Sequence, residues 1–189
     1  MSPIAVWILC YAALALLAVR FKTTGKSEVV HIIYVHFLLL VSVCLFAWFG
    51  VFLAWTMTPY ALVALIGSIT VIVAALGRLG VAYVPSCFIQ EWVLLTAGPF
   101  LATVMPFFAA AIITTLLFAI AHKGPKDTWK TWSSMFFLYM VWGMITLYLY
   151  LWLHQPLYNV ALHLFAGGML AYFGVIFRNR NEVPWLMPQ

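Results

Sequence analysis

Long apolar runs separated by short polar segments fill the chain. The longest run extends over 43 residues, Leu79–Ala121, and is interrupted only by Gln90 and Glu91. As a single helix it would be about 65 Å long, roughly twice the hydrocarbon thickness of a bilayer. Two spans that meet at Gly98-Pro99 would each fit the bilayer. The pattern therefore predicts two membrane helices with an outer turn at Gly98-Pro99.

The positive charges favour the same division. Cytoplasmic loops of membrane proteins hold an excess of Lys and Arg, and all nine Lys and Arg residues fall on one side if the long run is two spans. We therefore expect an all-α polytopic membrane protein with seven transmembrane helices, its N-terminus outside and its C-terminus inside. The single transmembrane domain covers residues 1–189, with approximate spans 3–20, 29–56, 59–77, 80–98, 99–121, 131–153 and 156–177.

Proline marks the start of each span that would descend from the outside. Proline suits the first helical turn because its missing N–H would have no partner there and its φ is already helical. The four prolines in question are Pro3, Pro59, Pro99 and Pro156. No turn predicted on the inner side has this feature, so the prolines support the predicted orientation.

Two of the outer turns resemble each other and suggest an internal repeat. WTMTP (55–59) and WLHQP (152–156) both have the form W-x-x-x-P, and the segments 59–77 and 156–174 that follow share several identities. Each segment also carries small residues on one helix face, which let helix backbones approach closely in lipid. We expect a possible 3+1+3 parallel repeat, with matching stripes at Thr70, Ala74 and Gly77 and at Gly167, Ala171 and Gly174.

Composition supports a membrane location and argues against other classes. The chain is 67% hydrophobic and 7% charged, whereas soluble domains carry roughly 25% charged residues. The net charge of +5 does not indicate nucleic-acid binding, since the basic residues lie in short clusters between spans. The three cysteines lie within apolar segments without a CxxC motif. We expect a multi-pass protein of the cell inner (cytoplasmic) membrane whose first span is retained.

Glu91 is the acidic residue predicted to lie at membrane depth. A carboxyl group there costs at least a few kcal/mol, so it marks a candidate functional site. Cys87 lies one turn earlier on the same helix face, Gln90 is adjacent, and Pro85 should loosen the helix. The alternative is a purely structural role, in which Glu91 bonds to a neighbouring group and joins its helix to the bundle.

Two histidines also fall within predicted spans. His36 should lie toward the inside and His163 toward the outside, where it shares a helix face with Asn159. With Glu91 between them, His36 and His163 would form a stepwise relay for a proton or cation, or be unrelated buried polar groups. Two histidines at different depths could not bind one haem between them, which weighs against a b-type cytochrome.

The sequence favours a carrier or channel for a small solute or ion, with proton coupling through Glu91. The alternative is an accessory or redox subunit, associated with haem or quinone, of a larger membrane complex. An enzyme is the less favoured class, and we identify no catalytic or metal-binding residues. No cofactor is predicted, with haem b as the runner-up. The expected partners are lipid and either further copies of the chain or other membrane subunits. The candidate path residues are Glu91, His36, His163, Asn159, Gln90 and Cys87.

Overall fold

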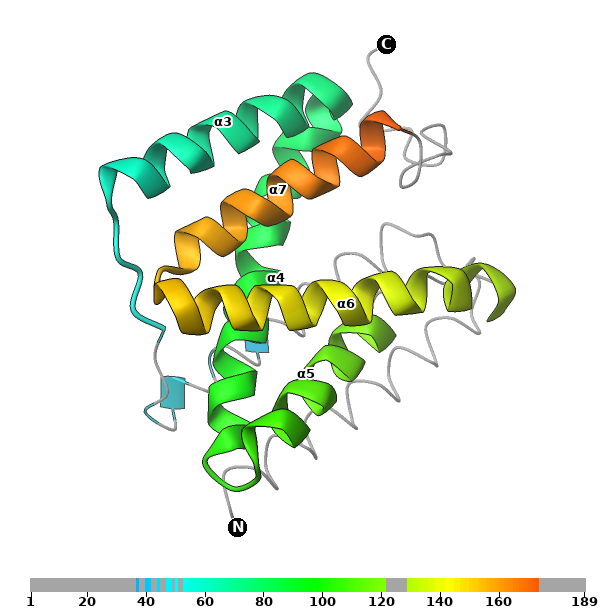
Figure 1. Cartoon of the computed structure of the whole chain (residues 1–189). Coiled ribbons are helices and arrows are strands. Elements are labelled where there is room, and N and C mark those ends of the chain that lie inside the picture. Colours follow the sequence, from blue (N-terminus) through cyan, green and yellow to red (C-terminus); the bar gives the residue numbers. More distant parts are fainter. Residues whose placement is uncertain are drawn as a thin grey trace. The chain divides into compact units, whose positions relative to one another are not determined.

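The computed structural model describes residues 53–121 and 129–173 and, before them, residues 37, 40, 41, 44, 47, 48 and 50. Most of these residues are helical, and none of them lies in a strand. Five helices are fully bounded: α3 (Pro59–Leu76), α4 (Arg78–Ala102), α5 (Phe107–Ala121), α6 (Trp129–Leu153) and α7 (Pro156–Tyr172). The all-helical prediction is thus confirmed for these segments (Figure 1). The predicted span 3–20 and most of 29–56 lie outside the described residues.

The long apolar run is indeed two helices, but the predicted turn position is wrong. Helix α4 continues through Gly98 and Pro99 to Ala102, and α5 begins at Phe107. Gly98 serves helix packing instead of a turn, because a Cβ built on it would lie 2.9 Å from Cδ2 of Leu147 in α6. Pro99 removes a single backbone hydrogen bond, and the helix tolerates this loss.

The actual turn covers residues 103–106. The amide nitrogen of Thr103 donates to the carbonyl oxygen of Phe100, and the carbonyl of Pro106 accepts from Ala110 N in the first turn of α5. Pro106 is the residue directly before α5, and Pro99 lies within α4, so the prediction of a proline at the first helical position is wrong for this helix. It is confirmed for α3 and α7, which begin at Pro59 and Pro156. Pro3 lies outside the described residues.

The described helices form two compact units. One contains α3, α4 up to Glu91, the end of α6 and α7, and the other contains the rest of α4, α5 and most of α6. The second unit is closely packed where Gly143 of α6 meets Thr115 of α5, since a Cβ on Gly143 would lie 2.5 Å from Cγ2 of Thr115. The described candidate residues, which are Cys87, Gln90, Glu91, Asn159 and His163, fall in the first unit.

In the first unit, α3 and α7 lie side by side and run parallel (Figure 1). At their starts, Thr58 Oγ1 donates to Gln155 Oε1 at 3.1 Å, and Thr58 also caps α3 by accepting from Ala61 N. Farther along, Gly168 lies against Ile72. The residues just before the two repeated prolines therefore contact each other, and the two helices stay in register from there.

The two small-residue stripes have different environments. On α7, Gly167 and Ala171 are buried, whereas Thr70, Ala74 and Gly77 on the α3 side are exposed. Helix α3 instead buries a different face, which consists of Ala61, Leu65, Ser68, Ile72 and Leu76. The expectation of two equivalent small-residue packing faces is therefore wrong within this chain, although Gly174 lies outside the described residues.

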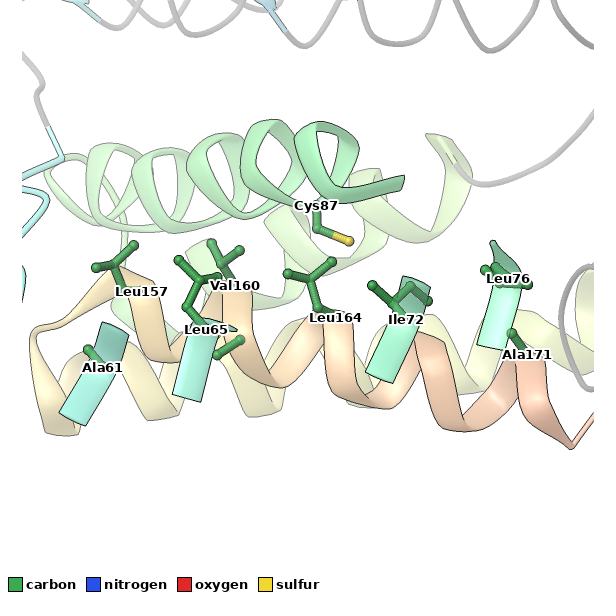
Figure 2. Close-up of a cluster of buried hydrophobic side chains, with 10 residues drawn as sticks. Ala61, Leu65, Ile72, Leu76, Cys87, Leu157, Val160, Leu164 and Ala171 are labelled. Atoms are coloured by element: carbon green, nitrogen blue, oxygen red, sulfur yellow. The ribbon is translucent and has the colours of Figure 1, made fainter. Parts of the chain in front are cut away.

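An apolar cluster fills the space between α3, α4 and α7. Figure 2 shows the side chains of Leu157, Val160 and Leu164 beside those of α3, with Cys87 pointing toward them from α4. Burial of a side chain the size of leucine stabilises by roughly 1.5–3 kcal/mol relative to water. The cluster consists of Ala61, Leu65, Ile72, Leu76, Cys87, Leu157, Val160, Ala161, Leu164 and Ala171.

Candidate functional site: a buried glutamate–histidine pair

Helix α4 carries three polar side chains on one face. Tyr83, Cys87 and Glu91 are spaced by four residues, which places them one above the other on a helix. Pro85 does not interrupt this face, because α4 is continuous from Arg78 to Ala102. The loosening predicted from Pro85 therefore produces no break. Cys87 and Glu91 both have 0% of their surface exposed.

Helix α7 presents Asn159 and His163 to the interior. The two residues are one turn apart, and both are buried. Glu91 contacts His163, while Tyr83 lies over Gly167, which is one turn farther along α7. The sequence of these contacts shows that α4 runs antiparallel to α7.

The imidazole of His163 bridges two groups of α4. Its Nδ1 is 2.7 Å from Oε1 of Glu91, and its Nε2 is 3.4 Å from Oη of Tyr83. The rings of Tyr83 and His163 meet edge to face, with centroids 6.1 Å apart. Cys87 lies between Tyr83 and Glu91 on α4 and is fully buried. Both ring nitrogens therefore have partners on one helix.

The pair makes a buried carboxyl group tolerable. An isolated buried charge is expensive, and it is normally paired or neutralised. Here a short bond joins the carboxyl of Glu91 to an imidazole that can carry the compensating positive charge. Oε2 of Glu91 makes no hydrogen bond within the described part of the chain. That oxygen is the part of the site that a proton, a water molecule or a cation could still engage.

The predicted candidates divide into three groups. Glu91 and His163, which are 72 residues apart in sequence, form the pair, and Cys87 and Asn159 are buried near it. Gln90 is not brought into the pair, since its Nε2 donates to Oγ of Ser86 in the same helix at 2.8 Å. His36 lies outside the described residues, so its place in a relay stays a prediction.

Tyr83 was not among the predicted candidates. Its only signal in the sequence is the spacing Y-x3-C-x3-E, which repeats at one helical turn. Aromatic residues make up 17% of the chain, so one more tyrosine does not stand out. Only the contact with His163 identifies it.

In this structure the two ring nitrogens of His163 face Glu91 and Tyr83 of α4. Among the described residues, no three His, Cys, Asp or Glu side chains are arranged to bind a metal ion.

Comparisons with known protein families, curated proteins and solved structures give no match to this chain. The interpretation of the site therefore depends on its own chemistry.

Proposed function

We propose that this chain is a small integral membrane protein that carries a small solute or ion across the bilayer, coupled to protons at the Glu91–His163 pair. The observation that carries the proposal is the 2.7 Å bond between Nδ1 of His163 and Oε1 of a fully buried Glu91. Acidic residues within a membrane are rare and mark ion pathways and proton relays.

Exposed apolar side chains support the membrane location. Within the described residues, two helices are long and apolar enough to cross a bilayer, Pro59–Leu76 and Met135–Leu153, and Phe107–Ile120 is apolar but shorter. Large contiguous apolar surfaces on a folded chain mark contact with lipid or protein. On these two helices the exposed large apolar residues are Tyr60, Leu62, Val63, Ile66, Phe137, Val141, Ile145, Tyr148, Leu151 and Trp152.

A seven-span topology with the N-terminus outside forms part of the proposal. The turn at residues 103–106 keeps the division of the long run into two helices, so all nine positive residues can still share the inner side. The 3+1+3 repeat is supported by the parallel, in-register starts of α3 and α7 and is weakened by their unequal buried faces.

Cysteine labelling tests this topology. In a background lacking the native cysteines, Val104→Cys should react with an impermeant thiol reagent applied to sealed cells. Lys126→Cys should react only after the cells are opened. Reaction of both positions, or of Lys126→Cys alone, in sealed cells would refute the proposed topology.

Loss or gain of a proton changes the net charge of the Glu91–His163 pair, and this change of charge can couple proton movement to transport. With one proton fewer, the pair bears a net negative charge that is costly in a low-dielectric interior and attracts a cation. With the proton present, the pair is neutral overall. A membrane site that alternates between these states can exchange a proton for another cation or take up a solute together with a proton.

Reconstitution into liposomes tests the function. Proteoliposomes that contain a pH-sensitive dye are given an imposed proton gradient and then a panel of small cations and neutral solutes. We expect at least one solute to change the internal pH through the wild-type protein, and Glu91→Gln to abolish this change while inserting normally. His154→Gln serves as the matched control, because His154 is exposed in the α6–α7 turn.

Two outcomes would replace the proposal. Solute-driven pH change that survives in Glu91→Gln would remove the pair from the mechanism. Purification with stoichiometric partner subunits or haem absorbance, and no flux by the chain alone, would favour the accessory subunit.

A further inference from the structure

We propose that Tyr83, His163 and Glu91 form one proton-binding unit in which the Tyr83 hydroxyl reverses its hydrogen bond to His163 as the proton enters and leaves. Gly167 is the positioning residue that lets Tyr83 reach the ring. This inference rests on the proposed function. It adds Tyr83 to the Glu91–His163 pair and names the atom on which the exchanged proton resides.

The hydrogen-bonding capacity of the three groups requires the reversal. A neutral imidazole has one N–H donor and one acceptor nitrogen, and a protonated imidazole has two donors. Before uptake, Nδ1–H of His163 donates to the Glu91 carboxylate, and the hydroxyl of Tyr83 donates to Nε2. After uptake, the added proton resides on Nε2, and Nε2–H donates to Oη of Tyr83. The charge of the unit changes from −1 to zero, and no covalent bond other than N–H changes.

A hydroxyl is the group suited to this position. It can both donate and accept, whereas an ammonium only donates and a carboxylate only accepts. Tyr83 therefore pairs with Nε2 in both protonation states, so this ring nitrogen keeps a partner in either one. At 3.4 Å the contact is long for a hydroxyl, so its loss should perturb the unit less than loss of Glu91.

Few other titratable groups surround the ring in the described part of the chain. Helix α4 brings Tyr83, Cys87 and Glu91 to it. Helix α3, which also packs against α7, has Tyr60 as its titratable residue, and that side chain is exposed. Tyr150 near the end of α6 and His154 in the α6–α7 turn have rings that contact each other. Cys87 is therefore the remaining group of α4 beside the ring, and the Cys87→Ser variant tests whether its thiol, and not the hydroxyl of Tyr83, is the partner of His163.

Gly167 positions Tyr83. A Cβ added at Gly167 would lie 2.8 Å from Cε1 and 3.1 Å from Oη of Tyr83. Such contacts are too short, so an alanine there forces the tyrosine ring to move away. Gly167→Ala therefore disturbs the Tyr83–His163 contact without changing any hydrogen-bonding group. A Cβ added at Gly67 on α3 would meet no atom within 4 Å, so Gly67→Ala is the matched control.

Nitrogen NMR of the full chain, labelled with 15N-histidine and reconstituted in lipid, tests the inference. The His163 signals are assigned by their loss in His163→Gln. In the wild type, we expect Nδ1 to carry hydrogen throughout the pH titration and Nε2 to gain it on acidification. Tyr83→Phe and Gly167→Ala should each lower the midpoint of this titration by about half a pH unit or more, because the doubly protonated ring loses its acceptor and a lost partner costs most at a charged group. Gly67→Ala should leave the midpoint within about 0.2 pH units, and Cys87→Ser should shift it less than Tyr83→Phe does.

The outcomes separate this inference from the proposed function. An unchanged midpoint in both Tyr83→Phe and Gly167→Ala would overturn the inference even if Glu91→Gln abolishes transport. A Cys87→Ser shift as large as that of Tyr83→Phe would also overturn it, because the thiol would then be the partner. Absence of solute-coupled flux in the wild type, together with the expected NMR shifts, would instead refute the transport function and leave the proton-binding unit intact.

Discussion

Removing one member of the Glu91–His163 pair should cost far more stability than removing both. His163→Leu leaves the carboxyl of Glu91 buried without its partner at 2.7 Å, in a position with no exposed surface. Breaking a buried pair in this way costs about 3–5 kcal/mol. Glu91→Leu leaves an imidazole, which can remain neutral and keep its contact with Tyr83, so we expect a smaller loss of about 1–3 kcal/mol.

The double variant, with leucine at both positions, should recover most of this loss. Replacing a buried pair by apolar residues of similar volume is often neutral or stabilising by about 1–4 kcal/mol. The coupling energy between the two positions should therefore be several kcal/mol. The assay is reversible unfolding in mixed micelles with increasing denaturing detergent, followed by circular dichroism at fixed pH.

The control cycle uses the hydrogen bond between Thr58 and Gln155. This bond is longer, at 3.1 Å, and only partly buried, so its coupling energy should be about 1 kcal/mol. Additive effects at Glu91 and His163, with a coupling energy no larger than that of the control, would refute a buried, mutually dependent pair.

Two further predictions concern packing and capping. Gly143→Ala should destabilise the chain by about 1–3 kcal/mol, because its Cβ would lie 2.5 Å from Thr115 Cγ2. In the same unfolding assay, the control Gly67→Ala should be neutral or stabilising by up to about 1 kcal/mol. Equal effects of the two variants would contradict the close packing at Gly143. Thr58→Val should lower the free energy of unfolding by about 1–2 kcal/mol, because α3 loses its N-cap. Thr58→Ser keeps a capping hydroxyl and should retain most of that stability. An equal loss in both variants would contradict the capping role.

Local rules predicted the helix starts. Pro59 and Pro156 begin α3 and α7 as expected, because proline at the first helical position depends on the backbone alone. The division of the long apolar run into two helices followed from its length and is confirmed. These features need no knowledge of which helices are neighbours.

The errors arose where tertiary contacts decide. Gly98-Pro99 has the composition of a turn, yet Gly98 lies within α4 and packs against Leu147 of α6. The residues Thr70 and Ala74 share a register with Gly167 and Ala171 but remain exposed, because α3 buries another face. Sequence spacing along one helix does not tell which face a partner helix will cover.

The residue types of the site could be predicted from the sequence, but the contacts between them could not, because those contacts depend on which helices are neighbours. Glu91 and His163 are unusual residue types in apolar helices, so each could be selected singly. Their contact joins helices 72 residues apart, and Tyr83 is recognisable only through that contact. The relay to His36 stays a prediction.

The most direct test of the central claim is infrared difference spectroscopy of the reconstituted chain between alkaline and acidic pH. The chain has four acidic residues, so a buried carboxyl group is readily assigned by substitution. We expect acidification to perturb a carboxylate stretching band, because the imidazole beside Glu91 becomes positively charged. Glu91→Gln should remove that band, and His163→Gln should shift it strongly. A spectrum in which Glu91→Gln changes no band from a buried carboxyl group, or in which His163→Gln leaves that band where it is, would contradict a proton held by the Glu91–His163 pair.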